Sequence, residues 1–332
     1  MKKNKRMLFS FLLLLVMGLL LGFLLRDSWP EIQRQLKNAA KEYLLVMLLL
    51  GNAYFVLDGM VYYHFAVKGG APITLLQAVA MAYMTVFFSI TTFGAGTKPC
   101  QTWYLYKNGM ELGKGIGILT VEYISHKMTV TLYACVAVVL QWRYLHQMFP
   151  SIQNYILMGF CVSIGIIFLL VWACLSDQPG RWVLKLCGRF WKKEGWRRRL
   201  SGLERQFVQL RSVGRIFFHW RSRWGKAVLL NACKLTCWYA MPWCAYVSVM
   251  HELPSVPFLH CILIGAIMQM LIGVIPSSGG IGSTEVVYLM LFGVLFGASG
   301  AGATAILYRF FSYYVPFVIS IGIVARITQS ER

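Results

Sequence analysis

Two charged residues near the end of the sequence have the side-chain types needed to bind a phosphate group. Arg309 lies within an apolar segment, and its guanidinium can engage a phosphate through two hydrogen bonds without losing its charge. Glu285 follows Ser283 and Thr284 at the predicted start of a helix, where the helix dipole stabilises a carboxylate. The free N–H groups of the same helix start would favour an anionic phosphate. Two interpretations of Glu285 therefore stand side by side, a helix cap and a ligand contact.

A glycine-rich break precedes this helix start. Residues 276–285 read PSSGGIGSTE and separate two apolar runs, 257–275 and 286–298. The proline has no N–H to donate, and the three glycines favour irregular backbone. Inside a bilayer such backbone is tolerated only where it is buried in protein or lines a wet cavity. The break is therefore typical of a transport or binding site, and a Gly-Pro turn at the membrane surface is the alternative. The candidate binding residues are Pro276, Gly279, Gly280, Gly282, Ser283, Thr284 and Glu285.

A second glycine-rich loop follows the apolar segment 72–93. It reads GAGTKPCQ over residues 94–101, and its candidate lipid contacts are Gly94, Gly96, Lys98 and Gln101. The loop is superficially similar to a nucleotide phosphate loop. It lacks the full GxxxxGK[ST] spacing and a preceding soluble strand, which excludes nucleotide binding.

Five further ionisable residues fall within apolar segments: Asp58, Glu122, His126, Lys127 and Lys234. A charged side chain costs about 2.5–3.5 kcal/mol at the bilayer centre, so such residues usually face the bundle interior and pair. Glu122 and His126 are four residues apart and can meet on one helical face. Lys127 can pair across helices, for instance with Asp58. For Asp58 and Lys234, ion pairs that only fix helix register are at least as good an interpretation as a functional role.

The composition indicates an integral membrane protein. Hydrophobic residues make up 58% of the 332 residues and charged residues only 13%, whereas soluble domains carry about 25% charged residues. The 32 Lys and Arg exceed the 12 Asp and Glu. In a membrane protein such an excess indicates which loops are cytoplasmic, and the basic residues attract anionic lipid heads. Most of this surplus clusters in one juxtamembrane segment, so nucleic acid is not an expected partner. The nine cysteines lack zinc-type spacing, and we expect no metal and no cofactor.

Nine apolar segments alternate with polar ones. Residues 7–25 form the first, which four basic residues precede, so the N-terminus should be cytoplasmic. A retained anchor is favoured over a cleaved signal peptide, because no small-residue cleavage site follows. Residues 27–42 suit a short interfacial helix. The other apolar segments are 43–66, 72–93, 115–140, 152–175, 227–250, 257–275, 286–298 and 301–325.

One sizeable polar stretch, residues 177–226, carries 14 Lys and Arg against three acids, with apolar residues interleaved at spacings near three and four. This pattern predicts amphipathic helices that lie on a leaflet among anionic lipid heads. If every segment crossed the membrane, the stretch would lie outside the cell, against the positive-inside rule. We therefore predict that 72–93 enters the membrane and returns. Residues 177–226 and both termini are then cytoplasmic, in a bacterial-type cell membrane.

These segments predict an all-α, polytopic membrane protein with one domain over residues 1–332 and about six to eight spans. The second half repeats the first, because a segment enters, breaks near 276–282, and another leaves. The two broken or re-entrant helix pairs resemble the inverted repeats of transporters, although the internal sequence similarity is weak. A re-entrant pair followed by one span and three full spans both place the C-terminus in the cytoplasm, so the count of crossings does not decide between them. The spacing of Gly113 and Gly117 predicts a close helix contact.

Three motifs carry a resemblance to a known family: IPSSGGIGSTE (275–285), YRFFSYYVP (308–316) and TTFGAGTKPCQTWYLYKNG (91–109). They resemble motifs of the transmembrane domain family of lysylphosphatidylglycerol synthases, the flippase-like half of the multiple peptide resistance factor. The resemblance covers roughly residues 8–325. It implies a lipid substrate such as phosphatidylglycerol, its aminoacylated form or a polyprenyl-phosphate lipid. Many members carry Gly-Glu and Arg where this chain has Lys98-Pro99 and Gln101, so no arginine contact is carried over to that loop.

Full-length synthases add a cytosolic domain that transfers an aminoacyl group from tRNA to phosphatidylglycerol. Residues 177–226 are too few for a domain of ~100–200 residues, so we expect this chain to lack the synthase half. No arrangement of residues suits hydrolysis, and no catalytic residue is predicted.

The leading hypothesis is a flippase-like protein that translocates or exposes a phosphate-bearing lipid. Arg309 and the helix start at 283–285 would contact the phosphate, with Glu285 near a cationic headgroup. The alternatives are phosphatidylglycerol lysyltransferase activity, alone or with a separate catalytic partner, and a membrane scaffold or lipid sensor. Homo-oligomerisation stays open.

Single cysteines at Lys107 and Arg198 test the topology. In a cysteine-free background both should resist an impermeant thiol reagent in intact cells, because both positions are predicted to face the cytoplasm. Labelling of Arg198→Cys from outside would refute the orientation. Labelling of Lys107→Cys alone would show that segment 72–93 crosses the membrane.

Overall fold

A computed structural model describes residues 29–92, 94–150, 153–190, 194–219, 221–253, 256–273 and 282–329. Within these ranges the secondary structure is helical and contains no strand, which confirms the all-α prediction. The first apolar segment, 7–25, lies outside the described residues. So do three candidate site residues, Pro276, Gly279 and Gly280.

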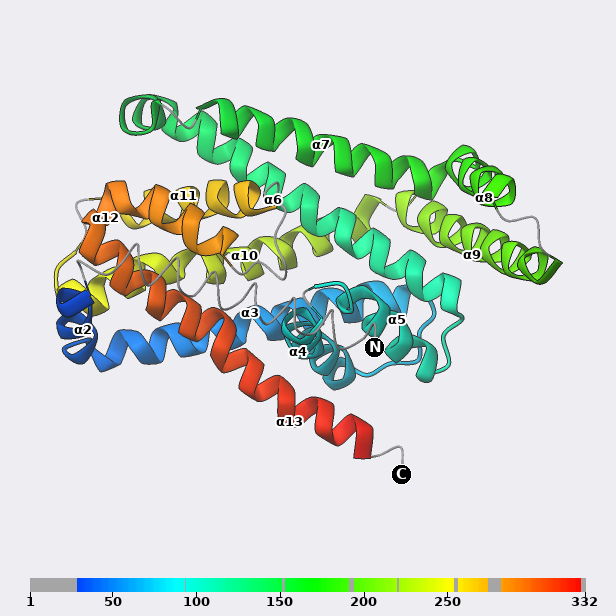
Figure 1. Cartoon of the computed structure of the whole chain (residues 1–332), viewed down its shortest axis with the longest axis horizontal. Coiled ribbons are helices and arrows are strands. Elements are labelled where there is room, and N and C mark those ends of the chain that lie inside the picture. Colours follow the sequence, from blue (N-terminus) through cyan, green and yellow to red (C-terminus); the bar gives the residue numbers. More distant parts are fainter. Residues whose placement is uncertain are drawn as a thin grey trace.

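The long helices form an elongated bundle. Helices α3 (Lys41–Lys68), α6 (Leu112–Met148), α7 (Gln153–Leu175) and α10 (Arg221–Met250) run along its long axis (Figure 1). Four helical stretches in the described part of the chain are long and apolar enough to cross a membrane: Lys41–Lys68, Leu112–Met148, Gln153–Leu175 and Ser299–Ile327. Together with the family assignment given below, they establish a multi-pass membrane protein.

The first interrupted hairpin consists of α4 (Leu75–Thr91) and α5 (Thr97–Lys107). A capping box between Thr74 and Gln77 begins α4. The turn between the helices places Gly94 at a φ of 83°, a left-handed conformation that glycine adopts at no steric cost. With 11 residues, α5 is about 17 Å long, too short for a hydrocarbon core of about 30 Å. The pair has the geometry of a helix that enters the membrane and a short helix that returns.

The second hairpin consists of α11 (Phe258–Ile272) and the first part of α12 (Ser283–Arg309). Gly297, with φ 72° and ψ 167°, interrupts α12. The apolar stretches on each side of the break, Phe258–Ile272 and Ser283–Gly297, are therefore each about 22 Å long. Beyond Gly297 a longer stretch continues through the π-helix η2 (Phe310–Tyr314) into α13 (Val315–Gln329). These lengths favour a re-entrant pair followed by one span.

The two halves of the bundle, α3–α7 and α10–α13, meet at α3 and α10, and the hairpin of each half packs against the other half. These helices are antiparallel, because Ala40 at the start of α3 donates its N–H to the carbonyl of Ser248 near the end of α10 (2.8 Å). Each hairpin then packs against the long helix that follows the hairpin of the other half, α4 against α13 and α11 against α6. Halves of opposite orientation that exchange partners in this way are characteristic of an inverted repeat.

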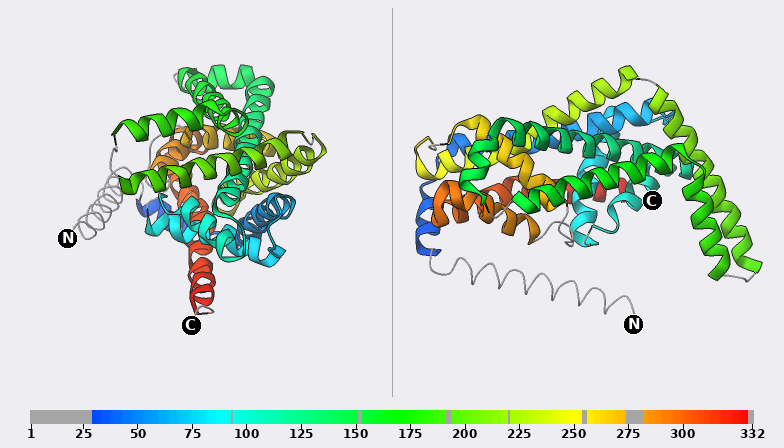
Figure 2. Two further views of the ribbon diagram at one scale, coloured as in Figure 1. Left: turned by 90° about the vertical axis from the view of Figure 1, so that its right-hand side faces the viewer. Right: turned by 90° about the horizontal axis from the view of Figure 1, so that it is seen from above.

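An amphipathic hairpin lies across one end of the bundle. It consists of α8 (Gln178–Phe190) and α9 (Glu194–His219), and its axes are turned away from the long axis (Figure 2). The small residues of α6 allow α9 to approach closely, since a Cβ added at Gly117 would lie 3.2 Å from the Cα of Leu210. The predicted close helix contact at Gly113 and Gly117 is thus the contact with α9. The short helix α2 (Trp29–Lys37) lies at the opposite end (Figure 1).

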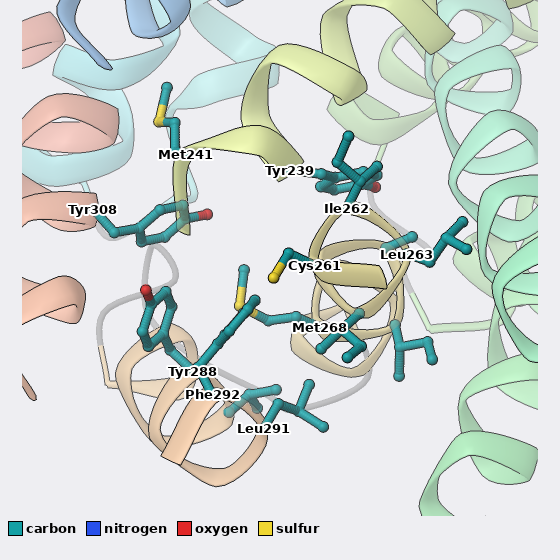
Figure 3. Close-up of a cluster of buried hydrophobic side chains, with 14 of the residues drawn as sticks. Tyr239, Met241, Cys261, Ile262, Leu263, Met268, Tyr288, Leu291, Phe292 and Tyr308 are labelled. Carbon is teal, nitrogen blue, oxygen red and sulfur yellow. The ribbon is translucent and has the colours of Figure 1, made fainter. Parts of the chain in front are cut away.

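Aromatic and sulfur-containing side chains fill the core between α10, α11 and α12 (Figure 3). Tyr288 and Tyr308 lie against each other with their ring centroids 5.2 Å apart, and both are almost fully buried. Cys261 is buried among them as a small apolar side chain. This cluster fixes the second hairpin against the long helices.

Replacement of Gly59 by alanine should destabilise the fold. A Cβ there would lie 2.5 Å from the backbone Cα of Val79 in α4, so α3 and the first hairpin would have to separate. We expect a loss of about 1–3 kcal/mol, the usual cost of overpacking, measured by thermal unfolding in detergent. Gly165→Ala is the matched control, because nothing lies within 4 Å of a Cβ at that position of α7. Equal melting temperatures for both variants would contradict the close approach of α3 and α4.

Candidate functional site

Three ion pairs join helices or helix segments around the candidate site residues. They join Asp58 to Lys234 (2.7 Å), Lys98 to Glu122 (3.1 Å) and Glu285 to Arg309 (2.5 Å). Each pair links two different helices or helix segments, so it fixes their relative positions as well as neutralising charge. In a medium of low dielectric constant, pairing of this kind is what allows charged residues to be tolerated.

The Asp58–Lys234 pair joins α3 to α10. Both side chains are nearly inaccessible, with 10% of Asp58 and 1% of Lys234 exposed, and the Lys234 ammonium also lies 5.6 Å from the centroid of the Tyr54 ring. The prediction that Lys127 can pair with Asp58 is wrong. The antiparallel contact of α3 with α10 brings Lys234 to Asp58, whereas Lys127 lies on α6, which faces α11 at that level.

The expected contact between Glu122 and His126 is also not formed. Glu122 accepts a hydrogen bond from the ammonium of Lys98 in α5, while His126 interacts with Asn231 in α10. Residues four apart share a helical face, but each of these two side chains interacts with a neighbouring helix instead. Sequence spacing within α6 gave no information about those neighbours.

Glu285 is a helix cap. One oxygen of its carboxylate accepts the N–H of Gly282 (2.6 Å), and the guanidinium of Arg309 donates to both oxygens, from Nε (2.5 Å) and Nη2 (2.9 Å). Gly282 has a φ of 84°, which favours glycine there. The capping interpretation is therefore confirmed. The Arg309 guanidinium also lies 5.0 Å from the centroid of the Tyr313 ring.

Two of the ion pairs repeat one arrangement with the charges exchanged. Lys98 is the second residue of the helix after the first break and pairs with Glu122, 24 residues later in the following long helix. Glu285 is the third residue of the helix after the second break and pairs with Arg309, also 24 residues later. Sequence reasoning missed this relation. The equal spacing of opposite charges after two glycine-rich breaks is a signal that could have revealed it.

A cavity of about 800 Å³ opens between α5, α6 and α7. Its size is within the range of small-molecule sites. The residues that line it include Gly94, Lys98, Thr102, Ile116, Tyr123 and Leu170. Two candidates from the first loop, Gly94 and Lys98, thus border one cavity.

The other two candidates of the first loop stabilise the turn or lie inside the protein. The N–H of Gly96 donates to the hydroxyl of Thr92 (2.7 Å), which closes the turn. Gln101 is 1% exposed and neither amide atom has a hydrogen-bond partner, although the side chain interacts with Tyr62. Buried amides are normally satisfied, so Gln101 marks a polar position that a water or ligand atom can complete.

The structure brings the candidates together as two centres, each with its own ion pair. The first centre holds Gly94, Lys98 and Glu122, and the second holds Gly282, Glu285 and Arg309. Ser283 and Thr284 are buried at the start of α12. Among the described residues no group of three or more His, Cys, Asp or Glu side chains is arranged to hold a metal ion.

Comparison with known families identifies the family. Residues 7–320 match the family model described as the lysylphosphatidylglycerol synthase TM region. The chain belongs to this family. Membership agrees with the motifs at both glycine-rich breaks and relates the protein to lysylphosphatidylglycerol synthesis, with membrane phospholipid as the class of molecule that it meets. No curated protein matches the chain.

A double-mutant cycle on Asp58 and Lys234 tests the buried pair that joins the two halves of this family member. Asp58→Asn and Lys234→Met should each lower the free energy of unfolding by about 3–5 kcal/mol, because each leaves an uncompensated buried charge. The double variant should lose less than the sum, as measured by thermal unfolding in detergent. The exposed pair of Glu111 and Lys114 is the control, and Lys114→Gln should change stability by about 0–1 kcal/mol. Additive losses at Asp58 and Lys234 would show that the two charges are not coupled.

Proposed function

We propose that this protein moves or exposes a phosphate-bearing lipid between the leaflets of the membrane. The observation that carries the proposal is the pair of interrupted hairpins, each with a glycine-rich turn or break and an ion pair at its helix start. Interrupted helices of this kind supply helix ends and polar side chains at membrane depth, which a charged headgroup needs in order to cross.

The Glu285–Arg309 pair supports a role in binding the lipid phosphate. The guanidinium holds a carboxylate with two parallel hydrogen bonds, and two oxygens of a tetrahedral phosphate can accept the same pair of hydrogen bonds. A lipid phosphate can therefore replace Glu285 at Arg309 with little loss of hydrogen bonding. The released carboxylate would then be able to meet a cationic headgroup, such as that of an aminoacylated lipid.

The basic hairpin α8–α9 supports a preference for an anionic leaflet. Arg205 and Arg215 are exposed on α9, and Arg211 pairs with Asp177 at the start of the hairpin. Exposed basic residues on a helix of this type attract anionic lipid heads, at about 1 kcal/mol for each residue near the surface. The hairpin would concentrate anionic lipid beside the start of α6, against which α9 packs.

The family description also favours a second candidate, a direct part in the synthesis of lysylphosphatidylglycerol. Incubation of the purified protein with charged tRNA and phosphatidylglycerol separates the two functions. Formation of an aminoacylated lipid by this chain alone would support the enzymatic candidate over the transport function.

The transport function predicts protein-dependent lipid movement in liposomes. Leaflet accessibility of phosphatidylglycerol, aminoacylated phosphatidylglycerol and a polyprenyl-phosphate lipid should be followed after reconstitution. Arg309→Lys should slow the movement about tenfold, because lysine loses the planar fork and with it a charge-assisted hydrogen bond of about 1.5–3 kcal/mol.

The control is Arg326→Lys, the same exchange at an exposed position of α13, which should leave the rate unchanged. Thermal unfolding of both variants shows whether the fold is kept. The absence of protein-dependent movement for all three lipids would refute the transport function.

A further inference from the structure

We propose that buried polar side chains between α3, α5, α6 and α10 form a proton path from Glu122 to Asp58, and that a proton crosses the membrane together with an anionic lipid. Ionisable residues inside a membrane bundle commonly mark such relays in transporters. The path itself stands without the proposed function. Only its coupling to lipid movement rests on that function.

One face of α3 connects the two ion pairs. Tyr54, Asp58 and Tyr62 follow one another at intervals of four residues, so they share a helical face. Lys234 of α10 pairs with Asp58, and its ammonium lies 5.6 Å from the centroid of the Tyr54 ring. The ammonium of Lys98 in α5 lies 5.8 Å from the centroid of the Tyr62 ring. The bases of both ion pairs therefore contact the same face of α3.

Tyr62 and Gln101 supply polar groups near the two acids. Tyr62 is almost fully buried, interacts electrostatically with both Asp58 and Glu122, and has the Gln101 side chain beside it. Both amide atoms of Gln101 are buried without a hydrogen-bond partner among the described residues. Buried amides are normally satisfied by protein or by ordered water. A hydroxyl and an amide in this position can therefore hold a water molecule that passes a proton between the carboxylates.

A second set of polar atoms borders the path on the side of α10. His126 lies one turn after Glu122 and next to Asn231, whose amide nitrogen donates to the hydroxyl of Ser125 (3.2 Å). Within the part of the chain that the structure describes, the Nδ1 atom of His126 and the Oδ1 atom of Asn231 are also buried without a partner. An imidazole can accept a proton at one nitrogen and donate from the other. The polar groups thus continue from Glu122 toward Lys234, three residues after Asn231 on α10.

The path has one open end and one closed end. Lys98 is 44% exposed and lines the cavity of about 800 Å³ between α5, α6 and α7, whereas its partner Glu122 is only 4% exposed. Asp58 and Lys234 are enclosed by the helices. A proton can therefore reach Glu122 from the cavity past Lys98, but it can reach Asp58 only through the protein.

The charged and titratable groups around the two carboxylates come from four helices. They are Tyr54 and Tyr62 on α3, Lys98 on α5, Tyr123, His126 and Lys127 on α6, and Lys234 on α10. Helices α4 and α7 contain no acidic, basic or histidine residue. Helix α9 faces α6 with Leu210 and Val213, and His260 of α11 contacts Tyr144 near the far end of α6.

This environment favours a proton over a metal cation. Each carboxylate already holds an ammonium group, and a metal ion such as Ca²⁺ needs six to eight oxygen ligands. A proton needs a single carboxylate oxygen. The acids and bases of the two ion pairs sum to zero charge, so each proton that enters adds one positive charge to the path.

The proton moves by exchange of O–H bonds alone. A hydronium ion in the cavity gives its proton to a carboxylate oxygen of Glu122, and the Lys98 ammonium loses its ionic partner. The Tyr62 hydroxyl then gives its own proton to Asp58 and receives the proton of Glu122, with water held at Gln101 closing any gap. The added positive charge balances a monoanionic phosphodiester, and this matters because one uncompensated charge costs about 2.3 kcal/mol per 100 mV of membrane potential.

Proton flux into liposomes tests the path. The full chain is reconstituted in phosphatidylcholine liposomes that contain phosphatidylglycerol and a trapped pH-sensitive dye, with the membrane potential held at zero by potassium and valinomycin. A pH step should produce a flux above that of protein-free liposomes. Gln101→Leu and Tyr62→Phe should each slow this flux about tenfold or more, because a lost proton-transfer group usually costs at least that much. Glu122→Gln combined with Lys98→Gln should abolish it without leaving a buried charge.

The matched control is Gln141→Leu. Gln141 is also buried with both amide atoms unpartnered among the residues that the structure covers, but it lies about 28 Å further along α6 than Glu122. This variant should keep the wild-type flux, and thermal unfolding shows which variants keep the fold. Infrared difference spectra between low and high pH in detergent give a readout without transport. They should show a carboxylic acid band in wild type that the Glu122→Gln, Lys98→Gln protein lacks.

The outcomes separate the path from the proposed function. Wild-type proton flux in the folded Gln101→Leu and Glu122→Gln, Lys98→Gln proteins would overturn the path. Lipid movement without any protein-dependent proton flux would overturn the path and leave the transport function standing. Proton flux that depends on Glu122, in a protein that moves no lipid, would support the path and refute the transport function. Coupling predicts that a pH gradient speeds the movement of phosphatidylglycerol in wild type and not in Gln101→Leu, and equal rates with and without the gradient would overturn the coupling.

Discussion

A charge or an unpaired backbone group in the interior of a membrane must find its partner within the protein, and the architecture follows from this constraint. Asp58 and Lys234 satisfy it for each other and thereby hold α3 against α10. Around this antiparallel pair, each hairpin packs against the long helix that follows the hairpin of the opposite half, so that Phe87 stacks on Phe317 and Tyr144 contacts His260. The pairing of charges and the exchange of hairpins stabilise one arrangement of the helices.

The same constraint gives the two hairpins related but opposite chemistry. After the first turn the helix start carries a base, Lys98, and after the second it carries an acid, Glu285. Each finds the opposite charge 24 residues further along the chain. A phosphate-bearing lipid moved as proposed would therefore meet a lysine at one helix start and, at the other, an arginine paired with a carboxylate.

A residue of the site could be predicted from the sequence when its partner lies in the same helix, and could not when its partner lies in a distant helix. The cap at Glu285 follows from local spacing, because Gly282 and Glu285 belong to one helix start, and this interpretation was available from the sequence. The close contact at Gly117 was also predictable as a contact, but its partner, α9, was not. Lys127 was expected near Asp58, and instead it lies beside Gly273 at the end of α11. The sequence does not show which of several intramembrane lysines pairs with Asp58, because the choice depends on which helix lies next to α3.

The sequence by itself determined the class of protein, the order of the apolar segments within the described residues, the two breaks, the amphipathic basic segment and the family motifs. These features depend on composition and on spacings within single segments, which the bilayer thickness and helix geometry translate directly into structure. Only the tertiary structure decided which charges pair, that α9 docks on α6, and that a cavity opens beside Tyr123. These features arise between helices that are far apart in the chain, and several different neighbours would satisfy the same sequence pattern equally well.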